Sequence, residues 1–350
     1  MTLAERVLAG DPRAMARAIS LIEDEDPASG DLVRAIFSHT GRAYLIGVTG
    51  PPGAGKSTLV DRLVTIIRTQ STQSTQSQPF SASSASSAFP TVGVIAVDPT
   101  SPFTGGAVLG DRLRMQSHAA DEGVFIRSMA TRGHLGGLAR ATGDAALVLD
   151  AAGKDVVIIE TVGVGQDEVD IIRTADVSIV TLVPGTGDEV QALKAGIMEI
   201  ADIFVVNKAD REGADRLVSA VEANQSLQPV EAGVWRPPIV KTVATSGAGV
   251  PELLAAIGQF RAHSQATQAA RRRTRSEYRL RELVAHRFMT FLERDVLTPG
   301  ELAAIVDRIA KREIDPYTAA NDLLARAGLK TGPYSGSGAG NGFQAVPNGR

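Results

Sequence analysis

The sequence predicts an α/β fold built on a doubly wound, mainly parallel sheet, and three observations carry this prediction. Seven short aliphatic runs alternate with segments of helical periodicity between residues 44 and 243. The runs are apolar throughout, which is typical of parallel strands covered by helices on both faces. The composition, with 35 Gly and 4% aromatic residues, also favours α/β over an all-β sandwich.

The apolar runs are short enough to be strands, and the segments between them are expected to return the chain as helices. Because such connections place helices on both faces, the arrangement is that of a doubly wound sheet. The seven predicted strands are Tyr44–Val48, Val92–Val97, Val124–Ile126, Val156–Ile159, Val177–Val183, Ile203–Val206 and Ile239–Val243.

Residues 1–40 form a predicted helical extension before the sheet domain, which is expected to span residues 41–264. Apolar residues recur at helical spacing from Leu3 to Val7 and again from Met15 to Ile22, so two or three short helices are expected. Residues 26–30 are rich in turn formers and are expected to form a turn after these helices.

A second helical extension is predicted over residues 265–328. Thr298 to Glu301 has the pattern of a capping box with Pro299 at the first helical position, and Asp315 before Pro316 indicates another helix start. The extension carries an apolar stripe, which needs either the parent domain or a second copy of the chain to pack on. The stripe consists of Leu280, Leu283, Val284, Phe288, Phe291 and Leu292.

The basic run from Arg271 to Arg275 is interpreted as a solvated helix start. Nucleic-acid binding is the alternative, but neither an aromatic residue nor a second basic patch accompanies the run. Since the net charge is -3, no nucleic-acid partner is expected.

Two segments have a composition that cannot support a core. Fourteen of the nineteen residues from Gln70 to Ala88 are Ser, Gln or Thr, so residues 70–88 are predicted to be a disordered surface insertion. The Gly-rich residues 329–350 are predicted to be a disordered tail.

Composition also excludes several classes of protein. The absence of cysteine excludes disulfides, thiolate metal sites and cysteine nucleophiles. No apolar run approaches the roughly 18 to 20 residues of a membrane helix, so no membrane span is expected. Charged residues interrupt the N-terminal segment from Glu5 onward, unlike a signal peptide, which makes the cytoplasm the expected compartment.

A phosphate-binding loop is predicted between the strand that ends at Val48 and a helix that begins near Lys56. Its glycines allow backbone N–H groups to approach a phosphate chain closely, while Lys56 adds charge on the β and γ phosphates and Ser57 offers a hydroxyl to Mg²⁺. The motif is Gly50-Pro51-Pro52-Gly53-Ala54-Gly55-Lys56-Ser57.

Three acidic residues are candidates for the magnesium site that accompanies such a loop. Asp98 and Glu160 follow predicted strands, and the carboxyl ends of parallel strands form the ligand crevice of an open α/β sheet. Helix capping is the alternative role for both residues. Asp111 lies in a Gly-rich segment and is the weaker candidate, because by itself it is only a loop acid.

The base is predicted to be guanine. Asn207-Lys208-Ala209-Asp210 follows the strand Ile203–Val206, where guanine-specific NTPases carry N-K-x-D. A carboxylate at Asp210 can accept from both the N1–H and the N2–H₂ of guanine, and adenine lacks this donor pair. Ser246-Gly247-Ala248-Gly249 resembles the companion loop whose backbone N–H contacts guanine O6.

Longer strings around these residues closely resemble the MeaB/ArgK family of methylmalonyl-CoA mutase-associated GTPases, also called MMAA-type. The resemblance extends over about residues 1–328. The matching strings are Gly47 to Thr58, Val97-Asp98-Pro99, Thr104 to Arg112, Thr131 to Gly137 and Glu160 to Gln166.

The resemblance implies a GTPase chaperone that gates adenosylcobalamin loading onto an acyl-CoA mutase, with methylmalonyl-CoA mutase expected, and that protects the mutase from inactivation. It implies a SIMIBI-type G domain that binds GTP or GDP with Mg²⁺ and a homodimer formed through the C-terminal helices. The implied switches are residues 98–115, 160–168 and 185–200. Lys56, Glu160 and Gly163 are the implied catalytic residues, and Thr58 joins the nucleotide contacts.

Two other classes of protein are alternatives to this resemblance. A nickel or cobalt metallochaperone GTPase shares the fold, but the chain has no Cys and only five scattered His. A transport-linked ATPase or kinase is an older assignment within the family, and the N-K-A-D sequence argues against ATP. The chain departs from the family's usual pattern at the insertion, at the tail and at Phe103, where relatives are expected to carry a polar residue.

Overall fold

The computed structural model describes residues 1–69, 90–98, 116–118, 120–130, 137–161, 163, 174–185, 197–227 and 233–329. The chain divides into two compact units, Met1–Glu277 and Tyr278–Arg350. The predicted insertion at 70–88, the acid Asp111, nearly all of the predicted tail and most of the three implied switches lie outside the described residues.

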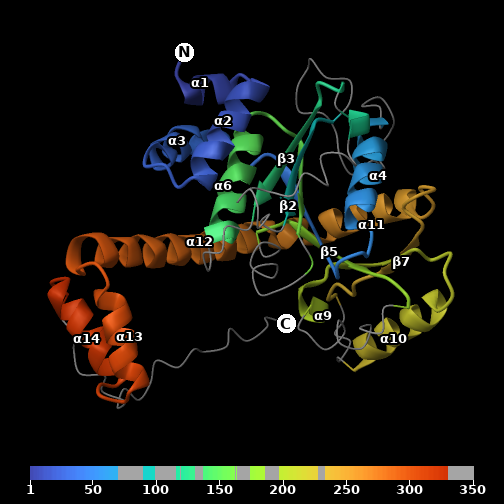
Figure 1. Ribbon diagram of the computed structural model, residues 1–350. Coiled ribbons are helices and arrows are strands. Elements are labelled where there is room, and N and C mark those ends of the chain that lie inside the picture. The colour runs from blue at the N-terminus through green and yellow to red at the C-terminus, as the bar shows by residue number, and fades with distance from the viewer. Residues whose placement is uncertain are drawn as a thin grey trace. The chain divides into compact units, whose positions relative to one another are not determined.

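The first unit contains a seven-stranded sheet in which all neighbouring strands are parallel. The strand order is β3-β2-β4-β1-β5-β6-β7, so β1 lies inside the sheet and the chain crosses over to both sides of it (Figure 1). All seven predicted runs are strands, and the doubly wound fold is confirmed. The strands are β1 (Tyr44–Thr49), β2 (Val92–Asp98), β3 (Val124–Ala130), β4 (Val156–Glu160), β5 (Val177–Leu182), β6 (Ile203–Asn207) and β7 (Ile239–Thr242).

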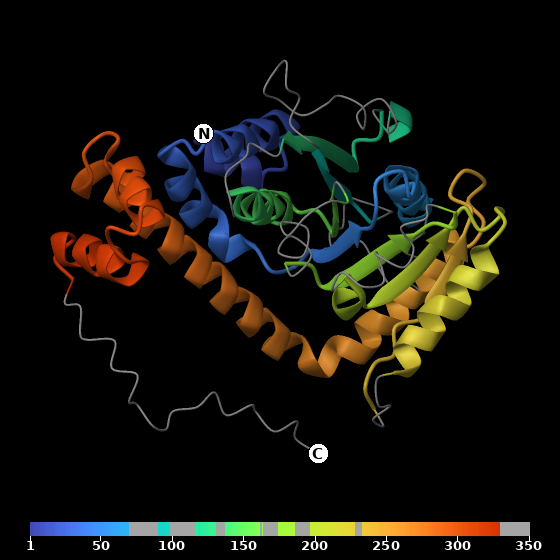
Figure 2. The ribbon, with the colours of Figure 1, turned by 60° about the horizontal axis from the view of Figure 1, so that its bottom comes forward.

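Helices cover both faces because alternate strand residues point into different cores. Ile46 and Val48 pack with the apolar faces of α4 and α11, whereas Val157 and Ile159 pack with the N-terminal helices and α6 (Figures 1 and 2). A third core joins β5 and β6 to α10. The helices that begin in this unit are α1 (Leu3–Leu8), α2 (Pro12–Glu23), α3 (Ala28–Ile36), η1 (Phe37–His39), α4 (Lys56–Thr69), η2 (Gln116–His118), α6 (Gly137–Ala151), α9 (Ile197–Ile200), α10 (Ala214–Ser226), α11 (Val250–Ser264), η3 (Gln265–Thr267) and α12 (Gln268–Phe291).

The N-terminal extension consists of three helices, as the periodicity predicted. Asp11 caps α2 by accepting from the N–H of Arg13 at 2.8 Å, with Pro12 at the first helical position. The predicted turn at residues 26–30 is wrong in part, because α3 already begins at Ala28. Asp26 accepts from the Ala28 N–H at 2.8 Å, and this bond satisfies a free donor at the start of the helix.

The run from Arg271 to Arg275 lies at the start of α12 and is largely exposed, as the sequence indicates. Three of its guanidinium groups also bond the segments that precede three strands, a role that the sequence alone did not predict. Arg271 donates to Asp176 O and to the carboxylate of Asp202, both at 3.4 Å, Arg272 to Gly41 O at 3.1 Å, and Arg275 to Thr174 O at 3.1 Å and the carboxylate of Asp176 at 2.5 Å.

The last turn of α4 is attached to the residue that precedes strand β2. Arg68 donates to Pro90 O at 2.9 Å and forms an ion pair with Asp121 at 2.7 Å. Residues 69 and 90 lie on either side of the segment 70–89. The guanidinium group of Arg68 therefore bonds the chain directly before this segment to the residue directly after it.

The second unit contains the remainder of α12, a π-helical turn η4 (Leu292–Val296), α13 (Glu301–Ala310) and α14 (Pro316–Arg326). Asp315 caps α14 as predicted, accepting from the N–H groups of Tyr317 and Thr318. The predicted capping box at Thr298 is present only in part. Glu301 accepts from the Thr298 N–H at 2.9 Å, as a capping box requires, and also from the Thr298 hydroxyl at 2.9 Å. The helix itself, α13, begins later than predicted, at Glu301 after Gly300, whose φ is +81°.

The predicted apolar stripe of the second unit is largely exposed. Leu280 is 62% exposed, Val284 59% and Phe291 40%, while Leu292 is buried. Within the described part of the chain, no helix combines the length and the apolar character needed to cross a bilayer.

Candidate nucleotide-binding site

The glycine-rich loop connects the end of β1 at Thr49 to the start of α4 at Lys56, as predicted. Gly50 opens the loop with a φ of +139°, and a Cβ atom there would lie 2.0 Å from Thr181 O on β5. No other residue fits this position without moving the neighbouring strand. Pro52 and Gly53 are exposed, whereas Ala54 and Lys56 are buried, so the loop turns one side toward solvent.

Lys56 lies under the loop, with its side chain 5% exposed. Its Nζ donates to Gly50 O at 2.8 Å and to Pro51 O at 3.2 Å. A Cβ atom on Gly163 would lie 2.1 Å from Gly50 O and 2.7 Å from this Nζ. Gly163, which has a φ of +101°, therefore packs directly against the loop and its lysine.

Ser57 and Glu160 meet beside the loop. The Ser57 hydroxyl donates to Glu160 Oε1 at 2.7 Å, and the two residues are 7% and 3% exposed. Glu160 reaches this position because β4 pairs with β1 in the register Val48↔Glu160. Thr161 continues the pairing, since its N–H donates to Val48 O at 3.0 Å.

Of the other two candidate acids, Asp111 lies outside the described residues. Asp98 ends β2 at the same carboxyl edge, two residues beyond Ala96, which is paired with Glu160. Among the described residues, no group of three or more His, Cys, Asp or Glu is placed to hold a metal ion by itself. This donor set still fits Mg²⁺, because that ion takes oxygen ligands and is held by one or two carboxylates together with substrate phosphates.

Asn207 connects the N-K-A-D segment to the phosphate loop. Its Nδ2 donates to Ala54 O at 2.8 Å, while its Oδ1 accepts from the Thr242 hydroxyl at 3.0 Å and from the Ala244 N–H at 3.1 Å. Lys208 follows with a left-handed φ of +56°, and its Nζ donates to Gly53 O at 2.6 Å. Both side chains therefore bond the loop, although they lie far from it in sequence.

Asp210 and the Ser246–Ala248 loop flank this connection. Asp210 is exposed, and the N–H of Ala209 donates to Thr242 O at 3.0 Å, which joins the end of the motif to β7. In the loop, the N–H groups of Ser246 and Gly247 both donate to Val243 O. The fold thus places the predicted base-recognition segments at the same edge of the sheet as the phosphate loop.

Two further residues support the site, and the sequence patterns did not predict either of them. Thr242 orients the Asn207 amide, and Arg62 of α4 donates to Ala244 O at 3.1 Å and Thr245 O at 2.9 Å. Thr242 could have been identified as a polar residue at the end of the last predicted strand. Arg62 could not, because its partners are backbone carbonyls that only the tertiary fold brings near.

Comparison with known proteins agrees with this site. Residues 15–295 match the profile of the family described as methylmalonyl-CoA mutase-associated GTPase MeaB. A protein of Pyrococcus abyssi, whose name gives it an inferred GTPase activity, is 48% identical to this chain over 327 residues. The match covers 92% of this chain and 95% of that protein. GTPase ArgK of Escherichia coli is 36% identical over 270 residues, covering 74% and 76%.

Among solved structures, the crystal structure of a LAO/AO transport system kinase has a TM-score of 0.64 at 26% identity. The match covers 93% of this chain and 97% of that one. The phosphate loop, the guanine motif bonded to it and the sequence matches agree with one another. The chain therefore belongs to the MeaB family of methylmalonyl-CoA mutase-associated GTPases, and it is an enzyme that hydrolyses GTP.

Proposed function

We propose that this GTPase is a chaperone for an adenosylcobalamin-dependent acyl-CoA mutase, with methylmalonyl-CoA mutase as the client. It gates loading of the cofactor onto the mutase and protects the mutase from inactivation. The support is the family match over residues 15–295, because the family is described by its association with that mutase.

In this proposal, the backbone N–H groups of the loop bind the phosphates, and the nucleotide contacts run from Gly50 to Thr58. Lys56 exchanges its carbonyl partners for the β and γ phosphates, which are stronger acceptors for an ammonium group. Ser57, Asp98, Asp111 and Glu160 hold Mg²⁺, which supplies neutralisation of phosphate charge when bound.

Glu160 and Gly163 act at the γ-phosphate in the same proposal. Glu160 is a buried carboxylate bonded to Ser57, so the serine hydroxyl is already oriented toward the metal position. Gly163 packs on Lys56 and Gly50 O, so a phosphate that moves the lysine also affects the backbone at Gly163.

Guanine is bound by the N-K-A-D segment and the loop that follows β7. Asp210 accepts from the two guanine donors, and the backbone of Ser246, Gly247 and Ala248 surrounds O6. Asn207 and Lys208 act chiefly by bonding the phosphate loop, which fixes the distance between the base and phosphate subsites.

The bond from Asn207 Nδ2 to Ala54 O carries the assignment of a guanine nucleotide. This bond makes the N-K-A-D segment part of the phosphate site. If the four residues were only a turn that matched the motif by chance, no such bond would be expected. This favours GTP over the ATP required by a transport-linked ATPase or kinase.

The second unit is proposed to dimerise the protein. Leu280, Val284 and Phe291 expose apolar area that water disfavours, and a second copy of the same helix would cover it. The resemblance to the family supports the same arrangement.

Single-turnover GTP hydrolysis, measured with and without purified methylmalonyl-CoA mutase, tests the proposal. Gly163 is followed by Val164, and the nearest glutamine is Gln166, so no side chain is assured to position the attacking water. We expect slow hydrolysis by the isolated protein and clear acceleration by the mutase. A rate unchanged by any acyl-CoA mutase would contradict the chaperone role and leave a generic GTPase.

Glu160→Ala provides the matched variant for this experiment. Its hydrolysis should fall by at least tenfold and lose its dependence on Mg²⁺, while GDP affinity changes less, because the proposed role is at the metal and the γ-phosphate. Equal losses of hydrolysis and GDP binding would place Glu160 in general nucleotide binding instead.

A further inference from the structure

A cavity of about 80 Å³ lies at the amino-terminal edge of the sheet, the edge opposite the phosphate loop. Tyr44 at the start of β1 and Asp176 just before β5 form its base. Arg261 of α11 and Gln268, Arg271 and Arg275 of α12 also line it. All of these residues belong to the first unit.

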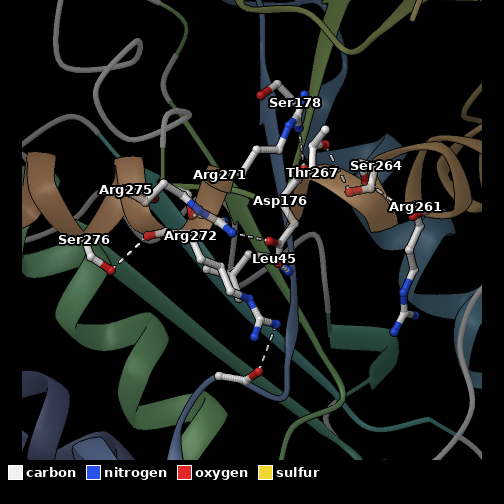
Figure 3. Close-up of polar contacts among 12 residues, drawn as sticks. Leu45, Asp176, Ser178, Arg261, Ser264, Thr267, Arg271, Arg272, Arg275 and Ser276 are labelled. Carbon is white, nitrogen blue, oxygen red and sulfur yellow. Dashed lines mark hydrogen bonds and ion pairs between the residues drawn. The ribbon is translucent and has the colours of Figure 1, made fainter. Parts of the chain in front are cut away.

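The lining carries more hydrogen-bond donors than acceptors. Three guanidinium groups face one carboxylate, that of Asp176. This carboxylate already accepts from the Leu45 N–H at 2.9 Å and from Arg275 at 2.5 Å, so much of its accepting capacity is used (Figure 3). Just outside the lining, Asp202 pairs with Arg271 at 3.4 Å, so three guanidinium groups against two carboxylates leave one positive charge in excess.

Two of the arginines are stacked on aromatic rings. The Cζ of Arg261 lies 4.9 Å from the centroid of Tyr44, and the Cζ of Arg271 lies 4.8 Å from the centroid of Phe260. Stacking uses the face of a guanidinium group, so the N–H edge of Arg271 can still meet acceptors. The hydrogen bonds that Arg271 donates to Asp176 O and to the Asp202 carboxylate are both long, at 3.4 Å, so a better acceptor could replace them.

We propose that this cavity binds a phosphate group. A volume of about 80 Å³ accommodates one tetrahedral oxyanion and is too small for a nucleotide. Fixed arginine forks are the side chains best suited to phosphate oxygens. Burial and the neighbouring Asp176 raise the pKa of Tyr44, so its hydroxyl stays protonated near neutral pH.

Isothermal titration of inorganic phosphate into the full-length protein tests the site. The protein is first saturated with a non-hydrolysable GTP analogue and Mg²⁺, so that the β- and γ-phosphate positions of the loop are filled and do not contribute. We expect saturable binding of one phosphate per chain. The same titration with glycerol 3-phosphate tests whether the cavity also binds a phosphate that is part of a larger molecule. A phosphate monoester binds only if the mouth of the cavity is open to the rest of the molecule.

Two variants change the cavity without removing the contacts of Asp176. Arg261→Gln removes one guanidinium group, and Gln268→Glu adds a carboxylate at the start of α12, where an acidic residue suits the helix. Each should weaken phosphate binding about tenfold, the effect of one charge-assisted hydrogen bond. Arg273→Gln, an exposed residue of the same helix outside the lining, should bind like the unmodified protein.

Circular dichroism of each variant establishes that it is folded. The proposal is overturned by the absence of saturable heat, by equal heat from sodium chloride at matched ionic strength, or by unchanged affinity in both cavity variants. Because the protein holds the GTP analogue throughout, a negative result leaves the assignment of the GTP site unaffected.

Discussion

Asn207 joins three parts of the nucleotide site through one side-chain amide. Its oxygen accepts from Thr242 and Ala244, which leaves its nitrogen to donate to Ala54 O in the phosphate loop. The Thr242 hydroxyl therefore sets which way the amide faces, and both residues are at most 2% exposed. A buried amide with every polar atom bonded is rigid, so the two subsites keep a fixed separation.

Thr242→Val removes that hydroxyl while keeping the shape of the side chain. We expect GDP affinity to fall about three- to tenfold, because Asn207 loses one of the two donors that orient it. Thr242→Ser keeps the hydroxyl and should restore most of the affinity. Titration with a fluorescent GDP analogue measures both. Unchanged affinity in Thr242→Val would show that the Ala244 N–H alone orients the amide.

Asp210→Asn alters the proposed contact with the base. The carboxylate suits the two donors of guanine, whereas an amide suits xanthine, which presents a carbonyl in place of the amino group. GTP affinity should fall and XTP affinity should rise, as measured by competition against labelled GDP. Equal binding of ATP and GTP by the unmodified protein would contradict the guanine assignment itself.

At the scale of elements, three aspartates repeat one role at the amino ends of the strands. Asp155 before β4 accepts from the Thr91 N–H at 2.7 Å, Asp176 before β5 from Leu45 at 2.9 Å, and Asp202 before β6 from Ser178 at 2.8 Å. Each carboxylate thus pairs an N–H group of the neighbouring strand at the end of the ladder. Burial raises the pKa of Asp202, although the Ser178 N–H and Arg271 act in the opposite direction.

Lys154, which precedes β4, lies at this edge and is 8% exposed. Burial lowers the pKa of its amine to about 8, and the charge of Arg68 acts in the same direction. In the unfolded chain the amine has a pKa near 10.5, so it takes up a proton at a higher pH than it does in the folded protein. The free energy of unfolding therefore falls as the pH is lowered from about 10.5 to 8. Below pH 8 the buried charge of Lys154 lowers the free energy of unfolding by its full amount, on the order of 3 kcal/mol.

Lys154→Met should therefore stabilise the protein at pH 7 by about 1 to 3 kcal/mol, since it removes a buried cation and loses only a 3.2 Å bond to Gly123 O. The advantage should shrink by pH 10, where the lysine is neutral. Thermal unfolding at both pH values measures this, with the exposed Lys311→Met as control. An advantage independent of pH would indicate a packing effect rather than a titration.

The strands could be predicted to within a few residues because burial on both faces leaves an aliphatic run in the sequence itself. The phosphate loop and Asn207 could be predicted for a similar reason, since their chemistry requires fixed local spacings. The start of α13 could not, because Gly300 adopts a left-handed φ and the helix begins only after it, at Glu301. The roles of Thr242, Arg62 and Arg271 depend on partners far away in sequence, so only the register of the sheet reveals them.

At the scale of the whole molecule, the two edges of the sheet have different chemistry. The carboxyl edge carries the phosphate loop, Glu160 and the N-K-A-D segment, at the edge where an open α/β sheet binds its ligands. The amino edge carries the aspartates and the arginines of α12. The helix that continues into the second unit therefore begins on the side of the sheet away from the nucleotide.

The exposed stripe of the second unit predicts a homodimer. Replacing Leu280 and Val284 together by Glu should give a monomer, because burying two carboxylates at the interface is strongly unfavourable. GDP affinity should not change, since both residues lie outside the nucleotide site. Light scattering at micromolar concentration measures the mass. A full-length protein that is already monomeric would show that the dimer proposal is wrong.

The bond from Arg68 to Pro90 O has a practical consequence. The bonds of Arg68 fix the chain on both sides of residues 70–89. A foreign sequence inserted in place of these residues would therefore not have to bring residues 69 and 90 together. The chain also contains no native thiol. One cysteine introduced between residues 70 and 89 would therefore be unique, and a dye could be attached to the protein at that single position.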